Sequence, residues 1–384
     1  MEDRPLITRV VLENYKSIAF CDVRLGPLSI LVGPNGAGKS NFLDALRFLS
    51  ELMYAPVANA IQKRGGFSRI CYRNGNGQAR LGFRIELKIG ETKGYISFRV
   101  KPDPETGYVL EREKHGVEHL PDRPKSHLQY DSPAPRAHLQ VLQEPSRSLL
   151  VESVSNCHFY NFFSESLRQP TPAYDEALLN DNGSNIPNVL HHMLERRGEA
   201  SERINQYLHS INPAIDFVNT QELNTYRALA FKLGTSNLDF DALQMSDGTL
   251  RSVAVLVALF QEWAGAPVSL VGLEEPEAAL HPAAAGVLFG ALHEASASVQ
   301  VIATTHSADL LDSKDVDTDA ILAVELRDGA TGIAHVDQTG RQALREKLYT
   351  AGELMRMNYL RPENTQSPDP AEIESILFED PVTA

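Results

Sequence analysis

The chain has 384 residues, 42% of them hydrophobic and 22% charged, with a formal net charge of −14. This composition is typical of a globular protein with a large core and more than one lobe, and no apolar run approaches the roughly 20 residues of a membrane helix. The acidic balance argues against coating nucleic acid through bulk charge, although a local basic surface is compatible with it. The start lacks a signal-peptide pattern and the three cysteines are far apart, so we expect a cytoplasmic location.

The first informative segment is a glycine-rich loop between a strand and a helix. Leu28–Val32 is typical of a short buried strand, and residues 41–49 have apolar side chains at helical spacing. Between them, the pattern G-x-x-x-x-G-K-[ST] is matched by Gly33, Pro34, Asn35, Gly36, Ala37, Gly38, Lys39 and Ser40. Backbone N–H groups of such a loop converge on one anion, Lys39 reaches the β- and γ-phosphates, and the Ser40 hydroxyl ligates Mg²⁺. The sequence therefore predicts a nucleotide-binding loop.

The middle of the chain alternates between strand and helix patterns. Strand-like runs cover residues 81–89, 95–100, 214–218 and 229–233, and the first two are joined by a hairpin turn at Gly90–Gly94. The stretch 101–136 is rich in Pro, His and charge, so we expect a loop-bearing excursion. Residues 174–211 have a helical pattern, with Pro187 in a first turn.

A second possible anion-binding terminus follows in Met245-Ser246-Asp247-Gly248-Thr249, at the start of an apolar helix. One triphosphate does not need two such cradles in one chain. The simplest explanation is that Ser246 and Gly248 face a nucleotide held by another subunit. An ordinary helix cap by Ser246 or Asp247 is compatible with that role.

Two apolar runs of strand length end in polar residues. The run from Val268 ends in Glu274 and Glu275, and the run from Val299 ends near His306. Ligands of open α/β sheets bind at the carboxyl ends of such strands. Glu274 would hold Mg²⁺, Glu275 would polarise the attacking water, and His306 would bond the γ-phosphate and that water. The alternatives are a helix-start signal for the acids and a structural role for the histidine.

The C-terminal part has two patterns. Residues 344–360 are amphipathic and either pack on the preceding lobe or dock a partner. The Pro- and acid-rich remainder from Arg361 is expected to be flexible.

The order of these motifs is similar to that in ATP-binding cassette (ABC) ATPases, and within them the chain resembles the soluble branch of SMC, RecF and OLD-type proteins. The narrower resemblance is carried by Gly38–Asn41, Met245–Thr249 and Glu274–Pro282. Leu12–Ser17 and Asp181–Asn185 also resemble predicted bacterial ATPases grouped with OLD proteins. The resemblance covers roughly residues 6–327.

The resemblance implies a P-loop NTPase of the ABC ATPase type, an α/β fold with a mixed sheet. An antiparallel β subdomain is added, and a helical lobe is inserted between the phosphate loop and the Ser-x-Gly motif. We expect four parts: an N-terminal ATPase lobe (1–100), an inserted lobe (101–240), a C-terminal ATPase lobe (241–327) and a partly flexible extension (328–384).

The resemblance also implies that two copies enclose two ATP molecules, with each phosphate loop facing the other copy's Ser246–Gly248. The implied ATP-binding residues are Gly33, Pro34, Asn35, Gly36, Ala37, Gly38, Lys39, Ser40, Asn41, Ser246 and Gly248. Ser40 and Glu274 would serve Mg²⁺, with Glu274 in place of the usual Asp, and Lys39, Glu275 and His306 would be catalytic. Gln62 is a candidate for the Mg²⁺-sensing glutamine, and Asn14 and Lys16 are candidates for the adenine site.

Two members of the branch fit less well. The long coiled-coil arm of SMC proteins needs many heptads, and the roughly 200 residues between Ser40 and Ser246 show none. A Toprim nuclease needs acids spaced as in Asp315-Val316-Asp317, but the roughly 60 residues that follow are too few for that domain. We therefore expect an ATP-dependent switch in bacterial anti-phage defence with a separate effector or toxin; the alternative is a RecF-like DNA clamp in DNA repair.

Overall fold

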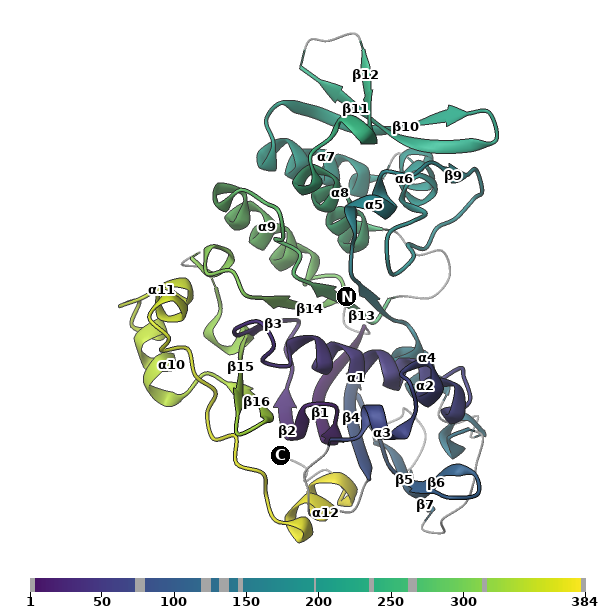
Figure 1. Ribbon diagram of the computed structural model, residues 1–384, viewed down its shortest axis with the longest axis vertical. Coiled ribbons are helices and arrows are strands. Elements are labelled where there is room, and N and C mark those ends of the chain that lie inside the picture. The colour runs from purple at the N-terminus through teal and green to yellow at the C-terminus, as the bar shows by residue number, and fades with distance from the viewer. Residues whose placement is uncertain are drawn as a thin grey trace. The chain divides into compact units, whose positions relative to one another are not determined.

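The computed structural model describes residues 4–72, 80–118, 126–130, 138–143, 148–196, 198–234, 238–261, 268–312 and 316–380 (Figure 1). The chain forms two compact units. The first contains residues 1–157, 318–342 and 360–384, and the second contains residues 158–317 and 343–359. Both units are therefore built from segments far apart in the sequence, and the four parts expected from the sequence stay a prediction.

The larger sheet of the first unit is antiparallel, as expected from the sequence, with strand order β2-β1-β4-β5-β6-β7. Its strands are β1 (Pro5–Tyr15), β2 (Ile18–Arg24), β4 (Leu81–Ile89), β5 (Thr92–Asp103), β6 (Gly107–Glu118) and β7 (Ser126–Tyr130). The predicted β4–β5 hairpin is confirmed. The prediction of a loop over residues 101–136 is wrong for the residues that the structure describes. Asp103 accepts hydrogen bonds from Glu105 and Thr106 in a turn, and after this turn the chain continues as β6.

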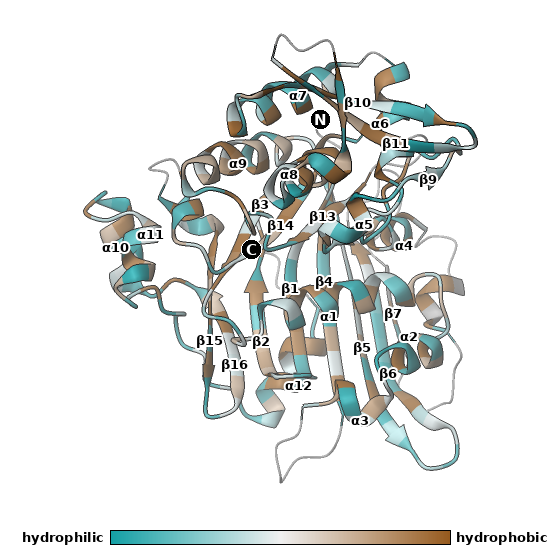
Figure 2. Ribbon diagram, turned by 45° about the horizontal axis from the view of Figure 1, so that its top comes forward, coloured by the Kyte–Doolittle hydropathy of each residue, from teal (hydrophilic) through white to brown (hydrophobic). Residues whose placement is uncertain are grey.

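One face of this sheet is apolar and packs on helices. Hydrophobic and polar residues alternate along β4 and β5 (Figure 2). Because successive side chains of a strand point to opposite faces, the hydrophobic ones share one face of the sheet. Phe83 of β4 stacks on Phe98 of β5 and contacts Tyr15 of β1 and Phe48 of the first helix. The helices of this unit's N-terminal part are α1 (Lys39–Leu52), α2 (Val57–Lys63), α3 (Phe67–Ile70) and α4 (Ser148–Ser155).

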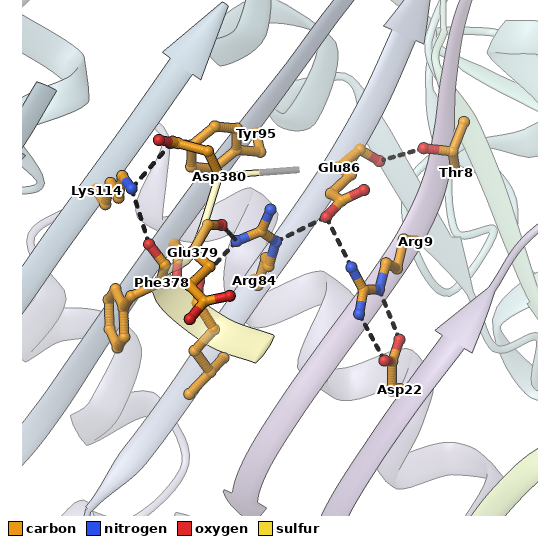
Figure 3. A network of polar contacts seen from close by, with 12 residues as sticks. Thr8, Arg9, Asp22, Arg84, Glu86, Tyr95, Lys114, Phe378, Glu379 and Asp380 are labelled. Atoms are coloured by element: carbon orange, nitrogen blue, oxygen red, sulfur yellow. Dashed lines mark hydrogen bonds and ion pairs between the residues drawn. The ribbon is translucent and has the colours of Figure 1, made fainter. Parts of the chain in front are cut away.

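The opposite face is covered by α12 (Pro370–Phe378), so the flexible tail expected from Arg361 is wrong for the described residues through Asp380. Ile373, Leu377 and Phe378 pack with Val11 of β1. Arg84 donates to the carbonyls of Leu377 and Glu379, and Lys114 donates to that of Phe378 (Figure 3). Cations of the sheet thereby stabilise the negative end of the helix dipole, which composition alone does not reveal.

The smaller strand group of the first unit is mixed, as expected. It contains β3 (Leu28–Val32), β15 (Ile321–Arg327) and β16 (Ala330–His335). β15 runs parallel to β3 and antiparallel to β16. The 288 residues between β3 and β15 therefore separate two neighbouring strands, and β15 lies beside the strand that leads into the phosphate loop.

The second unit contains a strand group and several helices, two of which contact the strands. β13 (Leu270–Glu274) runs parallel to β14 (Gln300–Thr305), and β8 (Cys157–Tyr160) belongs to the same sheet. The helices are α5 (Ser164–Leu167), α6 (Ile186–Glu195), α7 (Glu199–Ile211), α8 (Asp247–Phe260) and α9 (Pro282–Ala295), and α7 contacts both α8 and α9. The predicted helical stretch 174–211 is thereby confirmed for α6 and α7.

A second antiparallel sheet in this unit joins β9 (Thr171–Pro172), β10 (Ile215–Leu223), β11 (Tyr226–Leu233) and β12 (Asp239–Asp241). Towards the C-terminus, α10 (Gln338–Arg345) ends where the amphipathic stretch 344–360 begins, and that stretch contains α11 (Ala351–Arg356). Within the described ranges, none of the helices combines the length and the apolar character needed to span a membrane.

Candidate functional site

The phosphate loop follows the fully buried strand β3 and ends at α1, in the strand–loop–helix order predicted from the sequence. Gly36 and Gly38 have positive φ angles of 78° and 109°. A Cβ atom at Gly33 would lie 2.1 Å from the Val324 carbonyl oxygen, and one at Gly38 would lie 2.2 Å from Thr331 Oγ1. Glycine is thus required at 33 for close approach and at 38 for both space and backbone conformation.

The Lys39 ammonium group is hydrogen-bonded to the start of the loop. Its Nζ donates to the carbonyl oxygens of Gly33, at 2.7 Å, and Pro34, at 3.0 Å, and the residue is buried. The N-cap of α1 is Gly38, which offers no side-chain cap, and the first turn of the helix has no acid. The positive helix terminus and the ammonium group therefore favour an anion at this loop.

The other predicted residues of this loop differ in exposure. Pro34, Asn35, Gly36 and Ser40 are exposed, and Ala37 is buried. Asn41 donates from Nδ2 to the Ser17 hydroxyl at 2.6 Å, which occupies its side chain with the turn between β1 and β2.

The remaining N-terminal candidates have protein partners or are exposed. The Lys16 ammonium pairs with Asp44 of α1 at 2.5 Å, and Asn14 has a positive φ of 57°. Burial alone would raise the pKa of Asp44, but Arg64 and Lys16 hold it below its usual value. Gln62 is exposed on α2.

Glu274, Glu275 and His306 lie at the carboxyl ends of two parallel strands in the second unit, as predicted. Glu274 of β13 is in register with Thr304 of β14, so the residues after each strand share one edge. The Glu275 carboxylate lies 3.2 Å from His306 Nδ1 (Oε1 to Nδ1), and both side chains are partly exposed. Because Glu275 and His306 are far apart in the sequence, no local pattern indicates that they pair. The parallel register of β13 and β14 brings them together.

The backbone at Glu275 has a positive φ of 44°, which is rare outside glycine. Its N–H donates to the backbone oxygen and the hydroxyl of Thr304, and its carbonyl accepts from Arg251 of α8. These contacts hold Glu275, the residue predicted to be catalytic, in a strained backbone conformation.

Glu277 also lies at this site, although the sequence analysis gave it no role. It is 6% exposed, its Oε1 accepts from the Thr305 hydroxyl, and its Oε2 is buried without a hydrogen-bond partner among the described residues. Burial raises the pKa of this carboxyl group. A third acid directly after Glu274-Glu275-Pro276 was the only sequence signal.

The Ser246–Gly248 segment starts α8, as predicted. Ser246 is the N-cap, and its Oγ accepts from the Thr249 N–H at 3.2 Å, so the capping role weighed from the sequence is confirmed. A Cβ atom at Gly248 would lie 2.4 Å from the Ala279 carbonyl oxygen, which means that the start of α8 packs on the loop after Glu275.

Arg168 also holds this helix start, and sequence reasoning missed it. It donates to the carbonyls of Ala242 and Met245 and pairs with Asp247 at 2.5 Å. Its bond to Asp247 lowers the pKa of that carboxyl group. Arg168 and Asp247 are 79 positions apart, so no local sequence pattern indicates this contact.

Of the acids considered for a nuclease, Asp315 lies outside the described residues.

A protein family described as "AAA domain, putative AbiEii toxin, Type IV TA system" matches residues 28–312 of the chain. The chain is 47% identical over 53 residues to structural maintenance of chromosomes protein 4 of Dictyostelium discoideum, covering 13% of this chain and 4% of that protein. It is 52% identical over 46 residues to the DNA replication and repair protein RecF of Porphyromonas gingivalis, covering 12% and 13%. The chain thus spans only a small part of these relatives.

Two solved structures have a similar fold over most of the chain. A Smc head bound to the C-winged helix domain of ScpA has a TM-score of 0.58 and 17% identity, covering 88% of this chain and 99% of that one. A Pyrococcus furiosus Smc head with an extended coiled coil, bound to the C-terminal domain of ScpA, has a TM-score of 0.53 and 14% identity, covering 90% and 99%. The chain therefore belongs to the AAA-domain family described above, and its fold is that of a P-loop, ABC-type ATPase of the SMC/RecF-like branch.

Proposed function

We propose that the protein binds ATP with Mg²⁺ and hydrolyses it to ADP and phosphate. The observation that carries this proposal is the Glu275–His306 pair at a strand edge, in a chain that also holds a glycine loop with a buried lysine. The loop lies in the first unit and the pair in the second. Gly33–Asn41 bind the phosphates, and Lys39 neutralises charge on the β- and γ-phosphates.

The donor set fits Mg²⁺ held together with a nucleotide. Magnesium in such sites uses one or two protein oxygens, phosphate oxygens and water. Ser40 and Glu274 are the proposed protein ligands, and Ser40 is exposed on the first turn of α1. Within the described ranges no three His, Cys, Asp or Glu side chains gather as a cage, and a nucleotide-bound magnesium needs none. When bound, the ion neutralises negative charge that develops on the phosphates.

The chemical step is attack of water on the γ-phosphorus. The water oxygen forms the new bond, the bond from phosphorus to the bridging oxygen breaks, and its electron pair leaves with ADP. Glu275 orients the water and takes its proton, and His306, 3.2 Å away, fixes the position of the carboxylate.

A test uses Glu275→Gln, which keeps the shape of the side chain and removes its basicity. We expect phosphate release to fall about 10²–10⁴-fold while ATP affinity stays close to that of the wild type. Glu363→Gln, at a surface glutamate paired with Arg341, is the matched control and should turn over normally. Turnover of Glu275→Gln at the wild-type rate would overturn the assignment.

We propose further that ATP closes a homodimer in which Ser246 and Gly248 of the second copy complete the site. The start of α8 supports this, since it presents a helix terminus in addition to the one at the phosphate loop. Glu275→Gln should therefore accumulate as a dimer with ATP and remain monomeric without it. Light scattering after gel filtration measures this, and a monomer in both conditions would contradict it.

For the biological role, we propose a switch in bacterial anti-phage defence that acts in the cytoplasm on a separate effector or toxin. The family description, which names a toxin–antitoxin system, supports it. The second candidate is a RecF-like DNA clamp, favoured by the 46-residue match to RecF. DNA binding with ATP at several salt concentrations separates them, because only a clamp gives a steep salt dependence.

A further inference from the structure

Three polar side chains from distant parts of the first unit form a chain of hydrogen bonds behind the phosphate loop. Asn41 lies on the first turn of α1, Ser17 in the turn between β1 and β2, and Thr331 on β16. Asn41 Nδ2 is 2.6 Å from Ser17 Oγ, which is 2.7 Å from Thr331 Oγ1. Thr331 Oγ1 is in turn 2.8 Å from the Ala37 carbonyl oxygen. The chain of bonds starts and ends within the nucleotide-binding motif.

The chemistry of its ends fixes the direction of every bond. The Asn41 amide nitrogen only donates, and the Ala37 carbonyl oxygen only accepts. The single hydroxyl proton of Thr331 therefore belongs on the bond to Ala37, and the Ser17 hydroxyl donates to Thr331. Thr331 is 2% exposed, and its backbone N–H donates to the Ser17 carbonyl at 2.7 Å. Both hydroxyls are thus held in place by backbone as well as by side-chain contacts.

The bond to Ala37 sets the orientation of one peptide group of the loop. In a trans peptide the C=O of Ala37 and the N–H of Gly38 point in opposite directions. Because Thr331 holds the oxygen at the back of the loop, the Gly38 N–H points to the other side. Gly38 has a φ of 109°, and glycine alone would leave this peptide free to rotate.

The side chain of Thr331 also fills the space behind the loop. A Cβ atom at Gly38 would lie 2.2 Å from Thr331 Oγ1 and 2.6 Å from its Cγ2. The neighbouring strand β15 limits the other end of the loop, where a Cβ atom at Gly33 would lie 2.1 Å from the Val324 carbonyl oxygen. The β15–β16 hairpin therefore supports the loop at both its first and last glycine.

We infer that Thr331 and Ser17 are positioning residues, which hold the Ala37–Gly38 peptide with its N–H directed at the phosphate. This inference rests on the proposed binding of ATP. It assigns a role to the Leu12–Ser17 segment, which sequence resemblance singled out, and to a strand about 290 residues beyond the loop. Both residues act through the backbone of the loop and not by touching the nucleotide.

The test compares two substitutions at one position. Thr331→Val keeps the branched shape and removes the hydroxyl, and Thr331→Ser keeps the hydroxyl and removes the methyl group. We expect Thr331→Val to weaken equilibrium binding of a fluorescent ATP analogue about tenfold and Thr331→Ser to stay within about threefold of the wild type. Thermal unfolding without nucleotide should differ little between the two variants.

Ser17→Ala tests the same chain of bonds from a less buried position, and it replaces Thr331→Val should that variant fail to fold. Alone, it should weaken binding severalfold. Combined with Thr331→Val, it should add little, because the chain is already broken and the two effects are not additive. Full additivity would mean that the residues act separately and would overturn the inference.

Lys39→Ala separates this inference from the proposed function. If the wild type binds the analogue and Lys39→Ala does not, ATP binding stands. Thr331→Val with wild-type affinity then overturns the inference alone, as would equal losses in Thr331→Val and Thr331→Ser, which indicate packing only. A wild type that does not bind the analogue overturns both.

Discussion

The phosphate loop and the loop after Glu274 both follow buried strands, and both contain residues with positive φ. They differ in which residue types adopt that conformation. In the phosphate loop the residues are Gly36 and Gly38, for which the conformation is easily accessible. In the second loop they are Glu275 and Ala279, with φ angles of 44° and 67°, each at a cost of about 1–3 kcal/mol. Positions 36 and 38 need only backbone N–H groups, so glycine serves there, whereas Glu275 has to supply a carboxylate.

The contacts around each loop reflect this difference. Thr331 and Val324 pack against the phosphate loop at Gly38 and Gly33, where a larger residue would clash with them. The second loop is held by hydrogen bonds, from Arg251 to the Glu275 carbonyl and from Thr305 to Glu277. We therefore expect the first loop to be sensitive to added volume as well as to loss of the Thr331 hydroxyl, and the second mainly to lost polar groups.

The largest effect is expected from Gly38→Ala. The added methyl group would meet Thr331 and the backbone would be strained at a φ of 109°, so ATP affinity should fall more than about 100-fold. Gly36→Ala is the matched control, because nothing lies within 4 Å of its Cβ position and only the strain at φ 78° is added. Isothermal titration of both variants measures this, and equal losses would contradict the role of Thr331 as a steric support.

A smaller effect is expected from Thr305→Val in the second loop. Without the hydroxyl, the buried Glu277 carboxyl group loses its donor, so the free energy of unfolding should fall by about 1–3 kcal/mol. Thr305→Ser retains the hydroxyl and should recover most of that loss. Urea unfolding measures both variants, and a Thr305→Val protein as stable as the wild type would show that this bond contributes nothing.

Glu277 also predicts a pH dependence of stability. Burial raises its pKa in the folded protein above the ordinary 4.5, so between those two values the folded state binds more protons than the unfolded state. Its contribution to stability is therefore present below 4.5 and is lost as the pH rises through the folded pKa. Glu277→Gln removes this dependence, so its stability relative to the wild type should increase with pH over that window. Parallel urea-unfolding curves at every pH would argue against it.

The smallest effect is expected from Ala279→Gly. Glycine relieves the positive φ of 67°, which should raise the free energy of unfolding by up to about 1 kcal/mol, reduced by the extra freedom of glycine in the unfolded chain. Phosphate release should stay unchanged. A clear loss of stability would show that the Ala279 methyl group packs in a way that outweighs the strain.

Much of the fold and the local chemistry could be predicted from the sequence. The phosphate loop, the strand-end acids and the N-cap Ser246 are recognisable because each depends on residues close together in the chain. The antiparallel sheet followed from the alternation in residues 81–100.

The contacts that support the site could not be predicted in this way. Thr331 and Ser17 are 314 positions apart, and each is an ordinary polar residue by itself. The docking of α12 was missed because its segment is acidic and rich in proline, and because Arg84 and Lys114 alternate with apolar residues as solvent-exposed cations would. The spacing of Ile373, Leu377 and Phe378 was the available signal for a buried face.

If two copies enclose ATP as proposed, the phosphate loop of one copy and Ser246–Gly248 of the other serve the same ATP. Mixing two inactive variants tests it most directly: Lys39→Ala, which lacks the loop's charge, and Ser246→Arg, which blocks the helix start. In a mixed dimer one of the two shared sites is intact, so an equimolar mixture should recover about a quarter of wild-type ATP turnover. A mixture as inactive as its components, with mixed dimers demonstrated by co-purification of differently tagged variants, would contradict the claim.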